Sequence, residues 1–490
     1  MRSPRRLLSS SLVGLFVGLI AACSSTPHVA VDAGDVSDAS DGLCTNCPAG
    51  LTPGVVGRFS SLAALGSSVV VAAYEERFGD LVLVSAQGEL GSESKYEIID
   101  GVPMGDAPTH ALDGYRGGIS SPGDDVGHGT SLATTDDGAP WASYHDSTHA
   151  ALKYAHRDAQ GWAAHTVAQP TTNSQERVGL QTAATYLEGK PIIAYLVTGI
   201  ELDNGRFVSE LRLARAKSAA PTSSDDWQHE MIAQGHMPCD ELCAEGKHCF
   251  ILEDGTACQE ATTDCDACAD DTACLDGQCL EILESIGAEG SVIAFGTYPR
   301  IMVDGASTLV AFHDAVEGGV GLAHATDGQW QWSKLPLTPP YPGAFLSALL
   351  DTEGVHLAYQ DGQSETLHYA LIDKTTLAVI NEELVDDGRR VEGKHILGAD
   401  SALTVDAQGK IHIVYQDQTS AELLYVSRGT EGWEPSVAAE DGAGRVLLGG
   451  PRGYGFYNGL ATIDGQIHGS TFWVDAAGET PGGLEFFTLP

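Results

Sequence analysis

One short pattern recurs along this chain and limits the folds that it can adopt. Its fullest copy, Trp141 to Trp162, alternates apolar and polar residues, turns at a polar stretch and continues as a second apolar segment. Such alternation, broken by polar turns, is typical of antiparallel strands. An aromatic residue marks the end of the first segment in seven copies, at Tyr74, Tyr144, Tyr195, Phe312, Tyr359, Tyr415 and Phe472. We therefore expect an all-β chain.

Each copy carries signals for about four short strands. A small-residue segment such as Ser61 to Ala64 precedes each aromatic marker, an apolar segment follows it, and a Trp marks the last strand of most copies. Four of the six intervals between markers are 47 to 57 residues long. Four strands repeated at this period are the pattern of a β-propeller, whose sheets bury their faces against their neighbours. The sequence predicts a seven-bladed β-propeller at residues 51–490.

Two intervals are longer and must hold insertions. The first holds Gly101 to Gly127, rich in Gly, Pro, Ser and Asp, and the second holds a cysteine cluster at residues 236–282, between blades three and four. The last copy has only three strand signals, whereas the apolar segment Gly54 to Phe59 precedes the first copy. Because a closed ring removes exposed strand edges, we expect this segment to supply the fourth strand of the last blade.

The N-terminus has the layout of an export signal. Three arginines precede an apolar run at residues 12–22, which is too short to span a membrane. The run ends in Leu-Ile-Ala-Ala-Cys23, which resembles the lipobox of bacterial lipoproteins, whose cysteine is acylated. The resemblance implies a signal peptide at residues 1–22, lipidation of Cys23 and, with Ser24 next to it, an anchor in the outer membrane or at the cell surface. A plain secretory signal is the alternative.

Residues 23–50 are expected to form a flexible tether. Val31 to Gly42 has few apolar residues, and its four aspartates repel one another. This composition is similar to spacers in lipoproteins of deltaproteobacteria, including myxobacterial types. The aspartate spacing does not match a calcium-binding EF-hand loop. We expect no cofactor, with calcium left open.

The cysteines predict disulfides. Ten of the eleven remain after Cys23, an even number in an exported chain, and the clustered stretch has too few apolar residues for a core of its own. Zinc is the alternative, because two Cys-x-x-Cys pairs have ligand-like spacing. The spacing does not give the pairing. The ten are Cys44, Cys47, Cys239, Cys243, Cys249, Cys258, Cys265, Cys268, Cys274 and Cys279.

The charge excludes one class of partner. There are 67 Asp and Glu against 26 Lys and Arg, a formal net charge of -41 at pH 7. Nucleic-acid binding needs a basic surface, so we expect no nucleic-acid partner. Acidity of this size is mainly a means of solubility.

Strand alternation places both insertions and the polar turns on one face of the ring, where binding loops usually gather. The Asp of the repeated turns, at 146, 314, 361 and 417, is expected to be structural because it recurs. Non-repeating residues at the channel mouth are better candidates for binding. The innermost strands place Ser60, Thr130, Gln181, Tyr298, Phe345, Asp400 and Asn458 there. The predicted ligand-binding residues are His128, Gln181, Tyr298, Arg300, Asp400 and Asn458; a channel filled only by water is the alternative.

The strand pattern is similar to that of sialidase-like bacterial propellers with Asp-box (BNR) repeats, over nearly the whole mature chain. The Asp-box itself, Ser-x-Asp-x-Gly-x-x-Trp, is absent, and Thr326 to Trp330 matches it only in part. Neither an arginine triad nor a close carboxylate pair for glycoside hydrolysis can be assigned. We therefore expect a lipid-anchored, non-catalytic binding module for a glycan, peptide or protein. The alternative is a hydrolase or lyase of glycans or envelope polymers that acts at the channel mouth.

Overall fold

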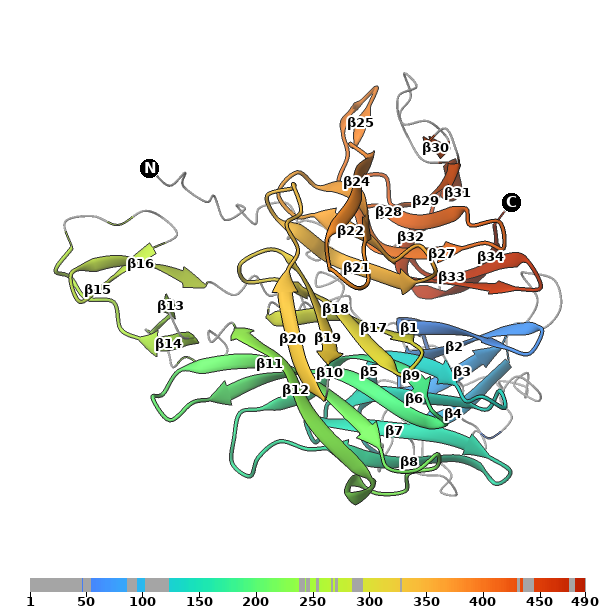
Figure 1. Cartoon of the computed structure of the whole chain (residues 1–490), viewed down its shortest axis with the longest axis horizontal. Coiled ribbons are helices and arrows are strands. Elements are labelled where there is room, and N and C mark those ends of the chain that lie inside the picture. The colour runs from blue at the N-terminus through green and yellow to red at the C-terminus, as the bar shows by residue number, and fades with distance from the viewer. Residues whose placement is uncertain are drawn as a thin grey trace, which may run out of the picture.

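The computed structural model is a ring of seven sheets in its described residues, which confirms the predicted seven-bladed propeller (Figure 1). The structure describes residues 46, 54–85, 95–101, 123–237, 243, 247–252, 255–265, 268, 272–283, 294–326, 328–429, 432–434, 445–475 and 481–489. Within these ranges the one helical element is the short 3-10 turn η3, Ser224–Asp226. No helix in the described ranges is long and apolar enough to cross a membrane.

The first three blades have four antiparallel strands each, paired in chain order. Blade 1 contains β1 (Val56–Leu65), β2 (Ser68–Glu75), β3 (Asp80–Ser85) and β4 (Lys95–Asp100). Blade 2 contains β5 (Val126–Thr134), β6 (Pro140–Asp146), β7 (Ala151–Asp158) and β8 (Gly161–Ala168). Blade 3 contains β9 (Arg177–Leu187), β10 (Lys190–Glu201), β11 (Phe207–Ala216) and β12 (Trp227–His236).

Blades 4 and 5 also have four strands, whereas in the described residues blade 6 has five and blade 7 has three. Blade 4 contains β17 (Phe295–Asp304), β18 (Ser307–Asp314), β19 (Val320–Thr326) and β20 (Gln329–Lys334). Blade 5 contains β21 (Pro342–Leu350), β22 (Val355–Asp361), β23 (Thr366–Ile372) and β24 (Val379–Asp386). Blade 6 contains β27 (Leu397–Val405), β28 (Ile411–Asp417) and β29 (Glu422–Gly429), with β30 (Gly432–Glu434) and β31 (Arg445–Leu448) on β29. Blade 7 contains β32 (Gly453–Ile463), β33 (Gln466–Val474) and β34 (Gly482–Thr488).

The first strand of every blade lies next to the first strands of the two neighbouring blades, so these strands surround the propeller axis. The hydrophobic cores lie between blades. Tyr144 of blade 2, for example, is fully buried in a cluster with Val70, Leu81 and Leu83 of blade 1. Because each sheet covers the faces of its neighbours, a single copy of the repeat cannot bury its apolar residues alone.

The segment at residues 54–59 does not supply the fourth strand of blade 7, and that part of the prediction was wrong. Residues 56–59 belong to β1, the innermost strand of blade 1, where Val56 pairs with Glu75 and Arg58 with Tyr74. Blade 7 has three strands in the described residues. These apolar residues form the start of β1. The strand therefore begins at Val56, five residues before the small-residue segment at 61–64 that marked it in the sequence.

The cysteine-rich insertion contains β13 (His248–Leu252), β14 (Gly255–Gln259), β15 (Thr272–Leu275) and β16 (Gln278–Leu283). It continues the sheet of blade 3, because Phe207 of β11 pairs with Thr256 of β14. The predicted disulfides are confirmed here by three bridges, Cys243–Cys258, Cys265–Cys274 and Cys268–Cys279, and Cys249 is also disulfide-bonded. The thiols named for zinc at 265 and 268 are therefore in bridges. Cys23, Cys44, Cys47 and Cys239 lie outside the described residues.

A small hairpin that the sequence did not predict projects between blades 5 and 6 (Figure 1). Its strands are β25 (Arg389–Arg390) and β26 (Gly393–Lys394), and Val391 at its tip is 84% exposed. Its base is fixed by Arg390, whose two terminal nitrogens donate to the two carboxylate oxygens of Asp386 at 3.0 and 2.8 Å. The Tyr415 hydroxyl also donates to Asp386, at 2.7 Å. A hairpin that buries little is thus held by a buried polar network.

Candidate functional site

A bulge recurs near the start of six innermost strands. At each bulge, two residues oppose one residue of the second strand. The first bulge residue has φ between 45° and 55° in every case. Such a conformation costs a residue other than glycine about 1–3 kcal/mol, and such residues cluster at functional sites. The six are Phe59, Gly129, Tyr298, Phe345, Asp400 and Tyr457.

The second bulge residue joins neighbouring blades. The Ser60 hydroxyl donates to the carbonyl oxygen of Tyr457 at 3.0 Å, and the Ser401 hydroxyl donates to that of Phe345 at 3.0 Å. The Asn458 amide likewise donates to the carbonyl oxygen of Asp400 at 2.8 Å. These bonds link blade 1 to 7, blade 6 to 5 and blade 7 to 6, so the second residue has a structural role at these junctions.

This register corrects three of the positions expected at the channel mouth. Ser60, Thr130 and Asn458 are second bulge residues, and the true equivalents of Tyr298 are Phe59, Gly129 and Tyr457. In blades 1 and 7 the bulge of the first strand faces the second-strand residue that comes just before the aromatic marker. Aligning the copies on the marker therefore places the predicted first-strand position one residue too late. In blade 2 the position is a glycine, which has no side chain to mark it.

Gly129 is required at its position for two reasons. Its φ is +55°, and a Cβ atom there would lie 2.2 Å from the carbonyl oxygen of Leu180. We expect Gly129→Ala to lower the free energy of unfolding by about 2–4 kcal/mol, from backbone strain plus the clash. Gly138→Ala is the control, because Gly138 also has positive φ but has no neighbouring atom within 4 Å. Urea unfolding would compare the two variants, and equal losses would show that the clash is absent.

Several half-buried side chains gather around the axis and form what we call the axial cluster: Phe59, His128, Tyr298, Arg300, Phe345, Asp400 and Tyr457. Its aromatic rings contact one another across blade junctions. The ring centroids of Phe59 and Tyr457 are 5.3 Å apart, and those of Tyr298 and Phe345 are 5.4 Å apart. His128 stacks on Phe59 with centroids 4.7 Å apart.

Two opposite charges belong to this cluster, Arg300 on β17 and Asp400 on β27. Blade 5 separates these strands, and each charge opposes the effect of burial on the pKa of the other. Burial raises the pKa of Asp400 to about 6, against the opposing effects of the Tyr457 backbone N–H and of Arg300. Burial lowers the pKa of Arg300, while Tyr298 and Asp400 oppose that change.

The raised pKa of Asp400 makes a prediction about stability. The folded protein binds this proton more tightly than the unfolded chain, so the stabilisation by protonation is complete below about pH 4 and is lost as pH rises through 6. Asp400→Asn removes the charge and retains an oxygen for the Tyr457 N–H. We expect the variant to be about 1–2 kcal/mol more stable than the wild type at pH 7 and similar to it at pH 4, by urea unfolding. A variant that is less stable at pH 7 would contradict the assignment.

The other predicted residues support this cluster. The Oε1 atom of Gln181 accepts the backbone N–H of Tyr298, so Gln181 fixes the bulge of blade 4. Asn458 holds the backbone of Asp400. Burial lowers the pKa of His128, whose Nε2 lies 3.7 Å from Asp125. Tyr298, Arg300 and Asp400 thus interact with one another, and His128 lies against Phe59 instead; the aromatic residues at 59 and 457 were missed.

The repeated turn aspartates are structural, as expected. Asp146 accepts the backbone N–H of His149, and Asp417 accepts those of Thr419 and Ser420. Asp314 and Asp361 close their turns in the same way. One of these turns also has metal-ligand types, since Asp124, Asp146 and His149 each place a ligand atom within 4.8 Å of the others.

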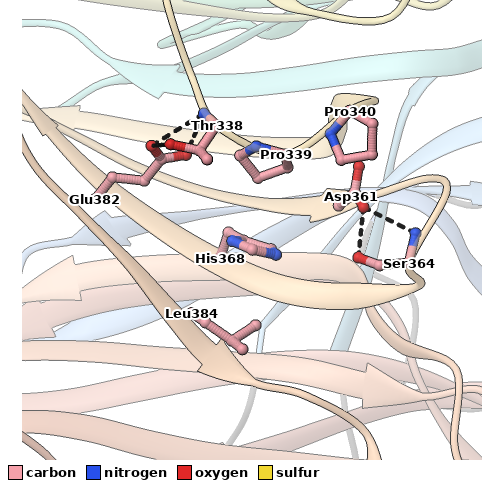
Figure 2. A pocket seen from close by; sticks show the side chains of 8 residues that line it. All are labelled: Thr338, Pro339, Pro340, Asp361, Ser364, His368, Glu382 and Leu384. Atoms are coloured by element: carbon pink, nitrogen blue, oxygen red, sulfur yellow. Dashed lines mark hydrogen bonds between the residues drawn. The ribbon is translucent and has the colours of Figure 1, made fainter. Parts of the chain in front are cut away.

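A separate shallow cavity of about 350 Å³ lies on blade 5 (Figure 2). Figure 2 shows Glu382 bonded to Thr338 on one side, Asp361 bonded to Ser364 on the other, and His368 between them. Both carboxylates already accept several hydrogen bonds, including one from Tyr359 to Glu382. The two carboxylates that line this cavity are therefore already engaged by the protein itself.

No protein-family profile and no curated protein sequence matches this chain. Among solved structures, a protein of unknown function from Dyadobacter fermentans superposes with a TM-score of 0.42 and 9% identity, over 74% of this chain and 94% of that chain. A Hadza microbial sialidase gives 0.40 and 10%, over 74% of this chain and 63% of that chain. Puromycin hydrolase gives 0.43 and 12%, over 88% of this chain and 52% of that chain. These similarities are too low to assign a chemistry.

Proposed function

We propose that this protein is a non-catalytic binding module of the cell envelope that takes a glycan, peptide or protein ligand at the axial cluster. The observation that carries the proposal is the recurring bulge, which holds aromatic residues at strained φ values around the axis beside Arg300 and Asp400. Half-buried aromatic faces with a few polar groups are typical of ligand sites. The start of each inner strand shares its edge with the polar turns, so the cluster lies on the loop-bearing face.

The alternative of a hydrolase or lyase rests on Asp400, because a carboxyl group that titrates near pH 6 suits general acid catalysis. A second carboxylate of the region, Glu76, forms an ion pair with Arg58 at 2.6 Å. In the described part of the axis, Asp400 therefore has no free carboxylate partner for two-residue hydrolysis. This arrangement favours binding over catalysis.

A glycan and peptide array tests the proposal. The probe is the secreted chain with Cys23→Ser, which cannot be acylated, and Tyr298→Ala is the test variant. Trp332→Ala, which changes an aromatic residue that is 41% exposed on the outer strand β20, is the control. Hits that persist in the control and disappear in Tyr298→Ala support the proposal. Hydrolysis of a bound hit by the wild type would favour the enzyme, and hits unaffected by Tyr298→Ala would exclude this site.

The membrane anchor is part of the proposal and rests on the lipobox-like sequence that ends at Cys23, outside the described residues. Acylation would place the propeller at the outer membrane or cell surface on a tether. Labelled palmitate should enter the wild-type chain but not Cys23→Ser. Equal labelling of both would contradict the anchor.

A further inference from the structure

The shallow cavity on blade 5 shares no lining residue with the axial cluster (Figure 2). Part of it is formed by one face of the sheet. His368 of β23 pairs with Leu384 of β24, and Glu382 lies two residues before Leu384 in a regular part of that strand. Alternate residues of a strand point to the same side of a sheet, so these three side chains share a face. The segment at residues 338–340 also lines the cavity. Its volume of about 350 Å³ is enough for one ligand side chain.

A chain of hydrogen bonds fixes the tautomer of His368. The Ser364 hydroxyl donates to the carboxylate of Asp361. The Thr366 hydroxyl lies 2.6 Å from the oxygen of Ser364 and 2.9 Å from Nε2 of His368. Because Ser364 has given its proton to the carboxylate, it accepts from Thr366, which in turn accepts from His368. The imidazole thus carries its proton on Nε2, and its Nδ1 is an acceptor without a partner in the described residues.

The side chains of the cavity offer acceptors and a negative charge that no cation compensates. The prolines at 339 and 340 have no N–H. Glu382 is half-buried, and the three groups that donate to it are uncharged: one backbone N–H and two hydroxyls. Asp361 is fully buried and also accepts from uncharged donors alone. Within the described residues neither carboxylate has a Lys, Arg or His nitrogen within 4.0 Å.

A ligand with several donors and a positive charge satisfies such a cavity best, because charge-assisted hydrogen bonds are about twice as strong as neutral ones. A guanidinium group presents five N–H donors in a planar fork and no acceptor, whereas an ammonium group presents three donors from one point. Lys394 of the hairpin reaches the rim, but it donates to the carbonyl oxygen of Ser364 and leaves both carboxylates without a cation. The chemistry therefore favours a guanidinium group from outside.

The apolar part of the cavity fits the rest of an arginine side chain, whose methylene groups pack on apolar surface while the charged end stays among polar groups. Pro339, Pro340 and Leu384, which is 51% exposed, supply that surface. A shallow cavity suits a side chain that projects from a partner, and a net charge of -41 favours basic partners. We propose that this cavity binds an arginine side chain of a peptide or protein, with the guanidinium group between Glu382 and Nδ1 of His368. This second site is independent of the proposed function at the axial cluster.

Calorimetry with short peptides tests the role of the charge. The probes are acetyl-Gly-Gly-Arg-Gly-Gly-amide and the same peptide with citrulline, which keeps the shape of arginine but is neutral. The protein is the Cys23→Ser chain, and the peptides are used at up to about 10 mM because a single side chain gives weak affinity. We expect the citrulline peptide to bind about tenfold or more weakly. A lysine peptide should also bind more weakly, since it has fewer donors.

Two variants locate the site. Glu382→Gln removes the charge and keeps an oxygen for the Thr338 donors, and Leu384→Lys places an ammonium group at the cavity from an exposed position. Each should weaken the arginine peptide about tenfold. Glu353→Gln removes one charge from an exposed residue between β21 and β22 and is the matched control. Urea unfolding verifies the fold of each variant, and the exposed position of Leu384 keeps the test valid if Glu382→Gln is unstable.

The outcomes separate this inference from the proposed function. Equal binding of the arginine and citrulline peptides, or no binding of either, overturns it. Equal effects of Glu382→Gln and Glu353→Gln also overturn it, because they indicate only a general attraction to an acidic protein. Loss of the arginine peptide in Tyr298→Ala but not in Glu382→Gln would place the peptide at the axial cluster. That result overturns this inference and supports the proposed function, whereas array hits lost in Tyr298→Ala have no bearing on the cavity.

Discussion

Asp386→Ala is expected to lower the free energy of unfolding by about 3–5 kcal/mol, the usual cost of removing one partner of a buried ion pair. Asp386 is fully buried, and its carboxylate binds both terminal nitrogens of Arg390 and the hydroxyl of Tyr415. Without it, a guanidinium whose side chain is 6% exposed loses its counter-charge. Urea unfolding at pH 7 would measure the loss.

Arg389→Ala is the control for this prediction. Arg389 is in the same hairpin, but its side chain is 87% exposed and that of its partner Asp387 is 26% exposed. Exposed ion pairs contribute about 0–1 kcal/mol. A loss below about 1 kcal/mol for Asp386→Ala, or equal losses for the two variants, would show that the buried network does not hold the hairpin base.

Trp141→Ala should be similarly destabilising, by about 3–5 kcal/mol, because it leaves a large cavity in a closely packed core. Trp141 is fully buried between blades 2 and 3, with its ring centroid 5.4 Å from that of Tyr154. Chemical unfolding again gives the measurement. Met231→Ala, at a residue that is 55% exposed on β12, should change stability by less than about 0.5 kcal/mol. A comparable loss in both would place Trp141 outside the core.

The repeat was visible in the sequence because its strands alternate and an aromatic marker recurs near the end of the second strand of each copy, within one residue of the same position. The hydroxyls of Tyr144 and Tyr415 each donate to an aspartate in the last strand of the preceding blade, Asp100 and Asp386 respectively. Turn aspartates were assigned to structure because they recur. These features follow from local pattern and repetition alone.

The bulges were not visible, because they depend on how neighbouring inner strands meet. Nothing in the sequence around Phe59 or Tyr457 distinguishes the first bulge residue from the second. A positive φ is usually predicted from glycine or asparagine, so it cannot be recognised where an aromatic residue adopts it. The pairing of the disulfides, such as Cys243 with Cys258, also needs the folded chain. The closing strand was misplaced for a related reason, since apolar residues before a repeat suit an inner strand as well as an outer one.

The position of β1 has a consequence for how the ring opens. In the part of the chain that the structure describes, blade 1 and blade 7 share no strand, and they adhere through Ser60, the core cluster of Val56 with Ile463 and Phe486, and nearby packing. Every other junction is also bridged by the chain. Separation of this junction breaks no sheet, so unfolding has a route in which terminal blades peel away singly, as units are lost from the end of a linear repeat array.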